Sequence, residues 1–349
     1  MKARHPMLRT IAAITTALAI AAFSLFAGGC SAEPADSVIP TFITDVYTAY
    51  NSYIYQDALG RRVTIPGDIH SIAATDFASA ALIIAAGMRD NLVATGAFCE
   101  SNTLFQRMGI PSSDPLKTMD GNAVNPQAII ALQPELVILS TENQKELGPL
   151  ENAGLNVGIL DNSTFEGFCQ SLCSLLPMDK SRPLTRDTVD IYYTIESALS
   201  QEKPCRVYLP SPENPLMTSD QPLMRDLVRA AGGRDVAEAI PAGTAVTAEQ
   251  LAKWDPDYIL LPEDAAYTKE DLLSDNRMAQ LSAVREGHVL QLPAVLWSDG
   301  SYSVLLGMQI EWLAMHLHPD RYPPQMVFTE IQDFFQRRFQ LDISLEDLQ

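Results

Sequence analysis

The sequence contains few residues of the kinds that carry catalysis or hold a bare metal ion. Its 349 residues include only five cysteines and five histidines. It has no G-x-S-x-G motif, which marks the nucleophile of α/β hydrolases, and no histidine lies in a recognisable catalytic context. The sequence therefore argues against an enzyme such as a secreted hydrolase, and against direct capture of bare zinc or manganese.

The cysteines do not form a redox or zinc motif. Cys169 and Cys173 are four residues apart, whereas redox motifs have the C-x-x-C spacing and zinc sites need a second ligand pair. Both residues fall on one face of a predicted amphipathic helix. We interpret them as buried apolar side chains, with a disulfide as the alternative if the chain is exported.

Basic residues are scarce. The chain has 24 Lys and Arg against 43 Asp and Glu, a net charge of −19. Residues 1–29 contain three of the basic residues and none of the acids, so the remainder carries 21 basic against 43 acidic side chains. This excess of negative charge argues against a nucleic acid or an anionic membrane surface as partner.

The N-terminus has the pattern of an export signal. Lys2, Arg4 and Arg9 precede an uncharged apolar run from Ile11 to Phe26. The sequence "AGGC" follows and ends at Cys30, which resembles a bacterial lipobox, although an alanine stands where leucine is more usual. The resemblance implies cleavage before Cys30 and lipidation of its thiol. An uncleaved membrane anchor is the alternative, and both interpretations place the rest of the chain outside the cytoplasm.

One pattern occurs twice. Residues Asn125–Ser140 ("NPQAIIALQPELVILS") and Thr247–Pro262 ("TAEQLAKWDPDYILLP") align with an offset of 122 residues. Each begins with a good N-cap residue, continues with a short helical pattern and a proline–acid pair, and ends in a continuous apolar run. Such runs are typical of buried strands in parallel sheets, so the repeat predicts two similar α/β lobes.

Strand and helix patterns alternate on both sides of one long helical segment, Thr185–Gln201, which we expect to link the lobes. We predict two Rossmann-like α/β lobes with parallel sheets, joined by one long interlobe helix. The expected organisation is a signal peptide (1–29), a tether (30–53), an N-terminal lobe (54–184), the interlobe helix (185–201) and a C-terminal lobe (202–349).

The chain resembles the solute-binding lipoproteins of ABC importers that handle iron-siderophores, haem and cobalamin. The resemblance runs from about Ile54 to Tyr322. It depends on the repeat, on "DALGRRVTIP" with "SIAATDFASAALIIAAGMRDNLVATG", and on "LVRAAGGRDVAEA" and "LGMQIEWLAMHLHPDRY". It implies a monomeric binding protein with a ligand cleft between the lobes, no permanently bound cofactor, and a membrane permease with its ATPase as partners.

Ligands of open α/β sheets bind at the carboxyl ends of the strands, so the loops that follow the predicted strands are the candidate site. In the family, a tryptophan is often presented to the cleft, and Trp297 matches it. The candidate ligand-binding residues are Asp76, Phe77, Phe98, Glu100, Ser101, Thr141, Glu142, Met217, Tyr267, Trp297, Ser298 and Tyr302. Aromatic side chains among them suit a large flat ligand, and the acids favour a neutral or cationic one.

The sequence departs from the family pattern at two places. A glutamate that docks on the permease falls at Ala81 here, which leaves Glu249 of the second lobe as the docking candidate. A basic residue often found after the cleft tryptophan falls near Ser303, which weakens the case for an anionic chelate. We expect a metal complex carried whole. An oxyanion such as molybdate or tungstate is the alternative ligand, and a sensor lipoprotein without transport is the alternative role.

Overall fold

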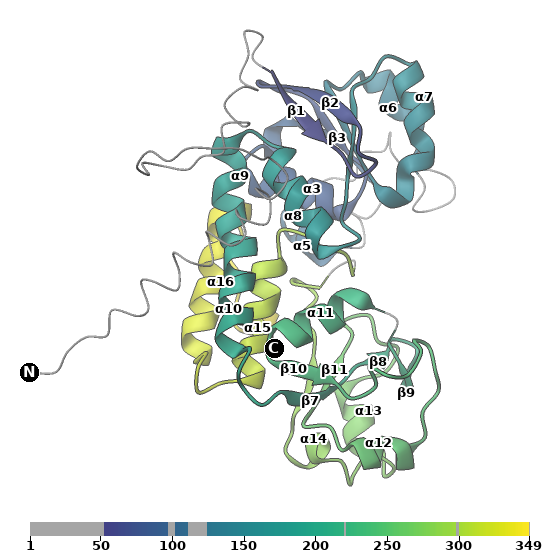
Figure 1. The fold of residues 1–349 in the computed structure, drawn as a ribbon, viewed down its shortest axis with the longest axis vertical. Coiled ribbons are helices and arrows are strands. Elements are labelled where there is room, and N and C mark those ends of the chain that lie inside the picture. The colour runs from purple at the N-terminus through teal and green to yellow at the C-terminus, as the bar shows by residue number, and fades with distance from the viewer. Residues whose placement is uncertain (1–51, 97–101, 111–123, 220, 298–299, 349) are drawn as a thin grey trace, which may run out of the picture. The chain divides into compact units, whose positions relative to one another are not determined.

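A computed structural model describes residues 52–96, 102–110, 124–219, 221–297 and 300–348 (Figure 1). All described residues belong to one compact unit. The predicted signal peptide, the lipidation site and nearly all of the tether lie outside the described residues. Among the helices of the described segments, none is long and apolar enough to cross a membrane.

The first lobe opens with the predicted hairpin and continues as a parallel sheet. β1 (Ser52–Gln56) and β2 (Arg62–Pro66) pair antiparallel around the turn that contains Gly60. The parallel sheet has the order β4–β3–β5–β6. Its strands are β3 (Ile72–Ala74), β4 (Leu92–Thr95), β5 (Leu136–Ser140) and β6 (Val157–Leu160). Its helices are α3 (Phe77–Ala85), α5 (Thr103–Arg107), α6 (Pro126–Leu132), α7 (Leu147–Asn152) and α8 (Phe165–Ser174).

The second lobe repeats this topology with the strand order β10–β7–β11–β12, again all parallel. Its sheet strands are β7 (Cys205–Tyr208), β10 (Gly233–Asp235), β11 (Tyr258–Leu261) and β12 (Val289–Gln291). An antiparallel hairpin, β8 (Pro210–Ser211) and β9 (Asn214–Thr218), was not predicted. The helices are α11 (Pro222–Ala230), α12 (Ala248–Trp254), α13 (Lys269–Ser274) and α14 (Ser282–Arg285). The two parallel sheets confirm the predicted fold class.

The repeated sequence forms the same structure in both lobes. Asn125 and Thr247 cap α6 and α12 by accepting a hydrogen bond from the backbone N–H three residues later. Both helices end in a left-handed residue, Gln133 with φ 46° and Asp255 with φ 44°. A proline follows each one and prevents the helix from continuing. β5 and β11 then run through the middle of their sheets, as the apolar runs predicted.

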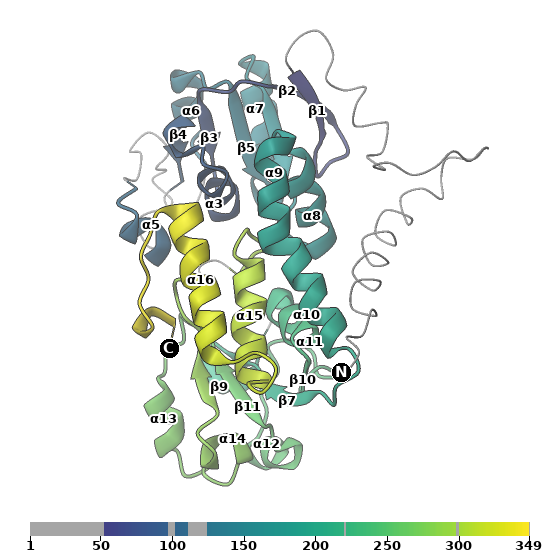
Figure 2. The ribbon, with the colours of Figure 1, turned by 90° about the vertical axis from the view of Figure 1, so that its left-hand side faces the viewer.

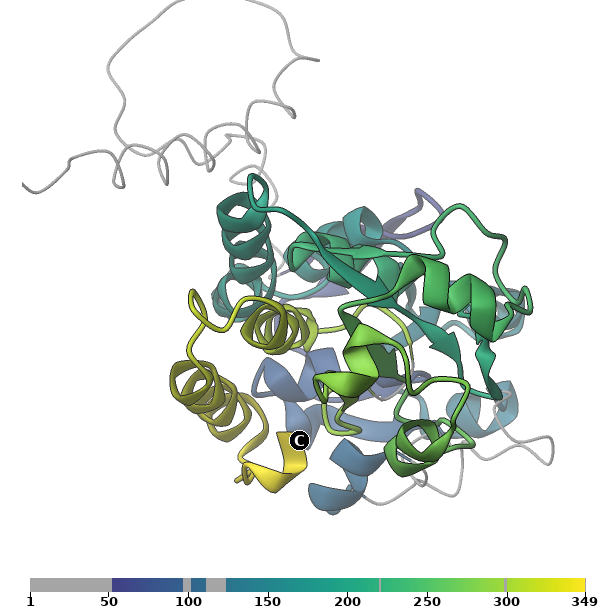
Figure 3. The ribbon, with the colours of Figure 1, turned by 90° about the horizontal axis from the view of Figure 1, so that it is seen from below.

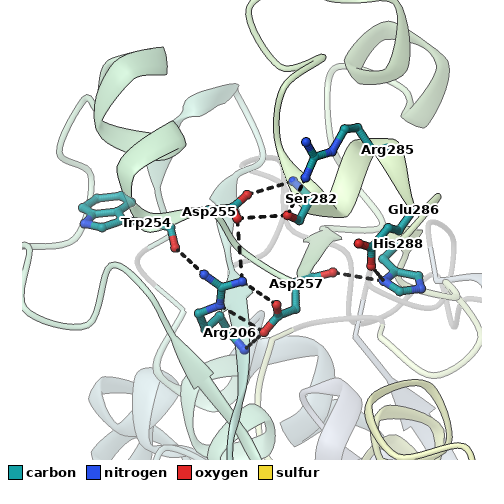
Figure 4. Close-up of polar contacts among 8 residues, drawn as sticks. All are labelled: Arg206, Trp254, Asp255, Asp257, Ser282, Arg285, Glu286 and His288. Atoms are coloured by element: carbon teal, nitrogen blue, oxygen red, sulfur yellow. Dashed lines mark hydrogen bonds and ion pairs between the residues drawn. The ribbon is translucent and has the colours of Figure 1, made fainter.

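The acid after each proline explains the proline–acid pair. The Glu135 carboxylate accepts hydrogen bonds from the backbone N–H groups of His70 and Ser71, just before β3. The Asp257 carboxylate accepts the N–H of Arg206 at 2.7 Å in β7 and also binds its guanidinium (Figure 4). Each acid therefore fixes the register between a central strand and its neighbour. These contacts lie at the amino ends of the strands, away from the edge where ligands bind.

The connection between the lobes differs from the predicted single helix over 185–201. The helix begins earlier, as α9 (Met178–Thr185), passes through a π-helical turn (Arg186–Asp190) and ends as α10 (Ile191–Leu199). Pro183 lies inside it, two residues before the predicted start at Thr185. The π-helical turn begins three residues after this proline, and such turns are common where a regular hydrogen-bond pattern is interrupted.

Two C-terminal helices complete this connection. α15 (Leu306–Leu317) packs against α10, and α16 (Pro324–Phe339) packs against α15 and also against α3 of the first lobe (Figure 2). Seen from below, α10, α15 and α16 lie side by side beside the second lobe (Figure 3). Arg338 of α16 donates a hydrogen bond to Asp187 in the π-helical turn at 2.7 Å. The lobes are therefore joined by a layer of packed helices.

The C-terminal segment Leu341–Leu348, which we call the C-terminal strap, returns to the first lobe. Arg107 of α5 pairs with Asp347 at 2.6 Å and donates to the Asp342 carbonyl. The Leu348 carbonyl accepts a hydrogen bond from the Trp312 indole of α15 at 2.8 Å. The expected C-terminal lobe, 202–349, therefore includes residues that pack on the first lobe.

Candidate functional site

Acidic residues follow three neighbouring strands of the first lobe. Asp76 comes after β3, Glu142 after β5 and Asp161 after β6. Because these strands are parallel and paired in the order β3–β5–β6, their carboxyl ends lie at one edge of the sheet. The structure thus brings together Asp76 and Glu142, which were predicted. Asp161, which was not predicted, follows the next strand at this edge, where its carboxylate accepts hydrogen bonds from the backbone N–H and the hydroxyl of Ser163. The same rule, applied to the strand before Asp161, could have found it.

Asp76 is the most closely held of these acids. It is half-buried and caps α3, with Oδ1 accepting from the Ser79 backbone N–H at 3.0 Å and Oδ2 from the Ser79 hydroxyl at 2.9 Å. Burial raises the pKa of the Asp76 carboxyl to about 6, against the lowering effect of the Ser79 hydrogen bonds. The negative charge of Glu142 raises it further. The ionised form of Asp76 is therefore destabilised in the folded protein, and a positive charge bound nearby would stabilise it.

Phe77 turns away from this edge. Its side chain is buried, and its ring meets Phe105 of α5 edge-on, with ring centroids 5.3 Å apart. Phe77 is the first residue of α3, just after the loop at the carboxyl end of β3, and α3 packs into the core. In this structure Phe77 holds α5 against α3 and presents no exposed ring to a ligand.

Trp297 is also buried, with 3 % of its surface exposed. Its ring packs edge-on against Trp312 of α15 at a centroid distance of 5.2 Å. Its indole N–H has no hydrogen-bond partner among the described residues. The predicted exposed aromatic platform is therefore absent here, because α15 covers the ring.

Tyr302 joins the lobes. Its backbone N–H donates to the Asn162 carbonyl of the first lobe at 3.1 Å, and its hydroxyl donates to the carboxylate of Asp226 on α11. The ring is buried and lies near Phe165 of α8. Because Asn162 follows β6 and Tyr302 follows β12, loops from the carboxyl sides of the two sheets meet at this contact. Tyr302 is thus a contact between lobes in this structure.

The remaining described candidates occupy the outer loops. Thr141 is half-buried and Glu142 exposed, in the turn after β5. Met217 is half-buried in β9, and its carbonyl accepts from the Tyr208 hydroxyl at 3.1 Å. The Tyr267 hydroxyl donates to the Ser211 carbonyl at 2.7 Å, which ties the β11–α13 loop to the β8–β9 hairpin. Four further candidates lie outside the described residues: Phe98, Glu100, Ser101 and Ser298.

Comparison with known proteins decides the family. The profile of the periplasmic binding protein family matches residues 72–296, which is more than half of the chain. The chain belongs to this family. Among curated protein sequences, none matches it. The members of the periplasmic binding protein family are binding proteins and not enzymes, and the family includes the solute-binding proteins of ABC transporters.

Solved structures of low sequence identity share the fold of this periplasmic binding protein. A periplasmic solute-binding protein from Veillonella parvula has a TM-score of 0.71 at 16% identity, covering 85% of this chain and 95% of that one. Haemophilus influenzae MolA, bound to molybdate, has a TM-score of 0.67 at 18% identity, with coverages of 83% and 99%. Helicobacter pylori CeuE, described as a nickel–histidine complex, has a TM-score of 0.61 at 16% identity, with coverages of 83% and 96%.

Metal ligands do not cluster in the described part of this periplasmic binding protein. No group of three or more His, Cys, Asp or Glu side chains there could hold a metal ion. Cys169 and Cys173 are free thiols. Burial raises the pKa of Cys169 to about 12, which keeps it protonated and unreactive at neutral pH. Cys173 is exposed and Cys169 half-buried, so the expected full burial of both is wrong.

The predicted docking positions differ in exposure. Ala81 has no exposed surface, so its place in α3 cannot contact a permease. Glu249 is exposed in the first turn of α12. Its counterpart in the repeat, 122 residues earlier, is the exposed Gln127 of α6. The two lobes thus present equivalent helix starts, of which only the second carries a charge at this position. Ser303, where a basic residue was expected, is buried.

Proposed function

We propose that this protein is the extracytoplasmic binding protein of an ABC importer and captures a metal complex between its lobes, such as an iron-siderophore, haem or a corrinoid. The observation that carries this proposal is the row of acids at the carboxyl edge of the first sheet: Asp76, Glu142 and Asp161. A metal complex of neutral or positive charge would find favourable electrostatics there.

The charge of this edge separates the proposal from its alternative. Molybdate and tungstate are oxyanions, and MolA, which shares the fold, is bound to molybdate. Here the N-terminus of α3, which could otherwise attract an anion, is capped by the carboxylate of Asp76. An oxyanion at this place would face like charge from both Asp76 and Glu142.

Support from aromatic stacking is smaller than the sequence suggested, because Phe77, Trp297 and Tyr302 are all buried. The proposal therefore rests on charge and on the fold shared with proteins such as CeuE, described as a nickel–histidine complex. Delivery to the permease would use the exposed Glu249 as a docking residue. We further propose that Cys30 carries the lipid anchor, on the strength of the "AGGC" sequence.

The test is titration of the purified protein by calorimetry with haemin, cyanocobalamin, ferric siderophores of different net charge, and molybdate. We expect one metal complex to bind. Asp76→Asn and Glu142→Gln should each lower the affinity for that complex. Glu286→Gln is the matched control, because this exposed acid lies just before β12, at the amino end of a strand in the other lobe. Tight binding of molybdate together with no binding of any complex would overturn the proposal and leave the family assignment intact.

A role as a sensor without transport needs a separate experiment. In cells that produce the protein, uptake of the complex that binds should fall when the protein is deleted and recover with the wild-type chain. Glu249→Lys should bind the complex normally and restore uptake poorly, because a charge reversal at a docking surface weakens association. Unchanged uptake in the deletion strain would favour the sensor role.

A further inference from the structure

A concave site lies in the second lobe, beside the edge strand β12. It is a cavity of about 630 Å³ between the β11–α13 loop, the start of α13, β12 and α15. Its lining includes Glu263, Tyr267, Glu270, Gln291, Trp312 and His316. All lining residues lie between positions 263 and 316, so the first lobe takes no part in it. The volume is within the range of about 300–1,000 Å³ that is typical of small-molecule sites.

His316, which lines this cavity, carries a hydrogen-bond acceptor. Its Nδ1 lies 2.8 Å from the Trp312 carbonyl oxygen, which can only accept, so Nδ1 carries the proton. Burial lowers the pKa of the imidazole, which keeps the ring neutral. In that tautomer Nε2 has a lone pair and no proton. The His316 ring also lies against Trp312, with ring centroids 4.0 Å apart.

The other polar groups of the lining include further acceptors. The Gln291 side-chain amide donates one N–H to the Pro262 carbonyl, which leaves its oxygen as an acceptor and its second N–H as a donor. Glu270 adds an exposed carboxylate, and Lys269 is the single cation of the lining. The half-buried Tyr267 contributes ring surface, because its hydroxyl is engaged by the Ser211 carbonyl. Trp312 has only 1 % of its surface exposed, and its indole N–H is engaged by the Leu348 carbonyl.

We propose that this cavity binds a small planar organic cation, such as an aromatic amidine or amine. The ring would lie against the apolar side chains, and its N–H donors would meet His316 Nε2 and the Glu270 carboxylate. A cation in contact with an aromatic ring gains further attraction. The lining belongs to the second lobe alone, whereas the proposed ligand site between the lobes depends on Asp76 and Glu142 of the first lobe; Tyr267 is the one predicted ligand-binding residue that lines this cavity.

Benzamidine is a suitable probe, with benzoate as its anionic match. The indole ¹H–¹⁵N resonance of Trp312, assigned with Trp312→Phe, reports on the cavity. We expect benzamidine to shift this resonance saturably at millimolar concentrations and benzoate to leave it in place. Glu270→Gln, at an exposed position, and His316→Gln should each weaken benzamidine binding about three- to tenfold. The control variants Glu286→Gln and Asp76→Asn should leave it unchanged.

Three results would overturn the proposal. One is the absence of a saturable shift with benzamidine. Another is binding of benzoate as tight as that of benzamidine. The third is benzamidine affinity that is unaffected by Glu270→Gln and His316→Gln, or abolished by Asp76→Asn, which would place the probe between the lobes. Because Glu270 is exposed, Glu270→Gln should fold. It therefore keeps the test decisive if His316→Gln fails to fold.

Discussion

Trp297 packs edge-on against Trp312, with the two ring planes at 73°. Trp312 is fixed in turn by its hydrogen bond to the Leu348 carbonyl of the C-terminal strap. A residue that the sequence placed on an open ligand platform is thus part of the packing between the carboxyl-side loop of the second sheet and α15. This relationship changes what replacement of Trp297 should do.

We expect Trp297→Ala to reduce the stability of the fold. Removal of a buried indole leaves a cavity, and such replacements typically cost about 3–5 kcal/mol in the free energy of unfolding. Trp297→Phe should cost clearly less, because it keeps ring contact with Trp312 and removes an indole N–H that has no partner in the described structure. Urea denaturation of the three proteins measures this. If Trp297→Ala kept wild-type stability and lost only ligand affinity, Trp297 would contact the ligand, as the sequence predicted.

Arg107 and Asp347 should show a measurable coupling, since they join α5 of the first lobe to the C-terminal strap. Both side chains are about 30% exposed, so the pair is partly screened by solvent. We expect a coupling of about 0.5–1 kcal/mol in a double-mutant cycle with Arg107→Gln and Asp347→Asn. Asparagine preserves the acceptor for Ser344, which limits unrelated losses. Strictly additive losses would mean that the ion pair does not contribute to joining the two segments.

Asp76 should make stability depend on pH. Its folded-state pKa of about 6 exceeds the ordinary value of 3.8, so the folded protein binds this proton more tightly than the unfolded chain. Ionisation of Asp76 therefore removes stability as the pH rises through this window. Asp76→Asn remains neutral and can still cap α3. It should be more stable than wild type by about 1–2 kcal/mol at neutral pH, and the difference should vanish near pH 4.

Urea denaturation at the two pH values tests this expectation. Asp76→Ala is the control, because it removes both the charge and the cap of α3 and should lose the benefit of the asparagine. An asparagine variant that is less stable than wild type at neutral pH would show that the ionised carboxylate is stabilised in the folded state. Binding of a cationic ligand should lower the pKa of Asp76, and the complex should therefore bind more weakly as the pH falls below about 6.

The sequence was most informative where local chemistry determines the structure. The caps Asn125 and Thr247, the following prolines and the apolar runs act over a few residues, so they predicted β5 and β11 correctly. The role of Glu135 and Asp257 could not be predicted in the same way. Their partners are strands 64 and 51 residues earlier in the chain, and a carboxylate before a strand is normally solvated.

The candidate site was less predictable for a related reason. The predicted parallel strands place Asp76 and Glu142 at one edge of the first sheet, because each residue follows one of two paired parallel strands. This pattern says nothing of which loop side chains another element covers. Trp297 is covered by α15, and Tyr302 bonds to Asn162, more than a hundred residues away. The interlobe helix begins before Pro183, where α9 packs against α8, so the helix continues through a residue that the local sequence would be expected to interrupt.

The last prediction concerns the contact between α15 and the π-helical turn of the interlobe helix. A Cβ added at Gly307 would lie 2.1 Å from the Asp187 carbonyl oxygen, far inside the contact distance, and that oxygen belongs to the backbone. Gly307→Ala must therefore push α15 away from the turn, or distort it, and we expect a loss of about 2–4 kcal/mol. This is opposite to the usual gain from replacing a helical glycine by alanine.

Gly148→Ala is the matched control. Gly148 lies in α7, has no neighbouring atom within 4 Å of an added Cβ and does not need a positive φ. Its replacement should be neutral or stabilise the protein by up to about 1 kcal/mol, as expected for a helix interior. The free energies of unfolding of the two variants, measured side by side in urea, separate the effect of helix propensity from that of close contact. Equal stability of the two variants would show that α15 and the turn can separate freely, and the helical layer would then be a loose connection between the lobes.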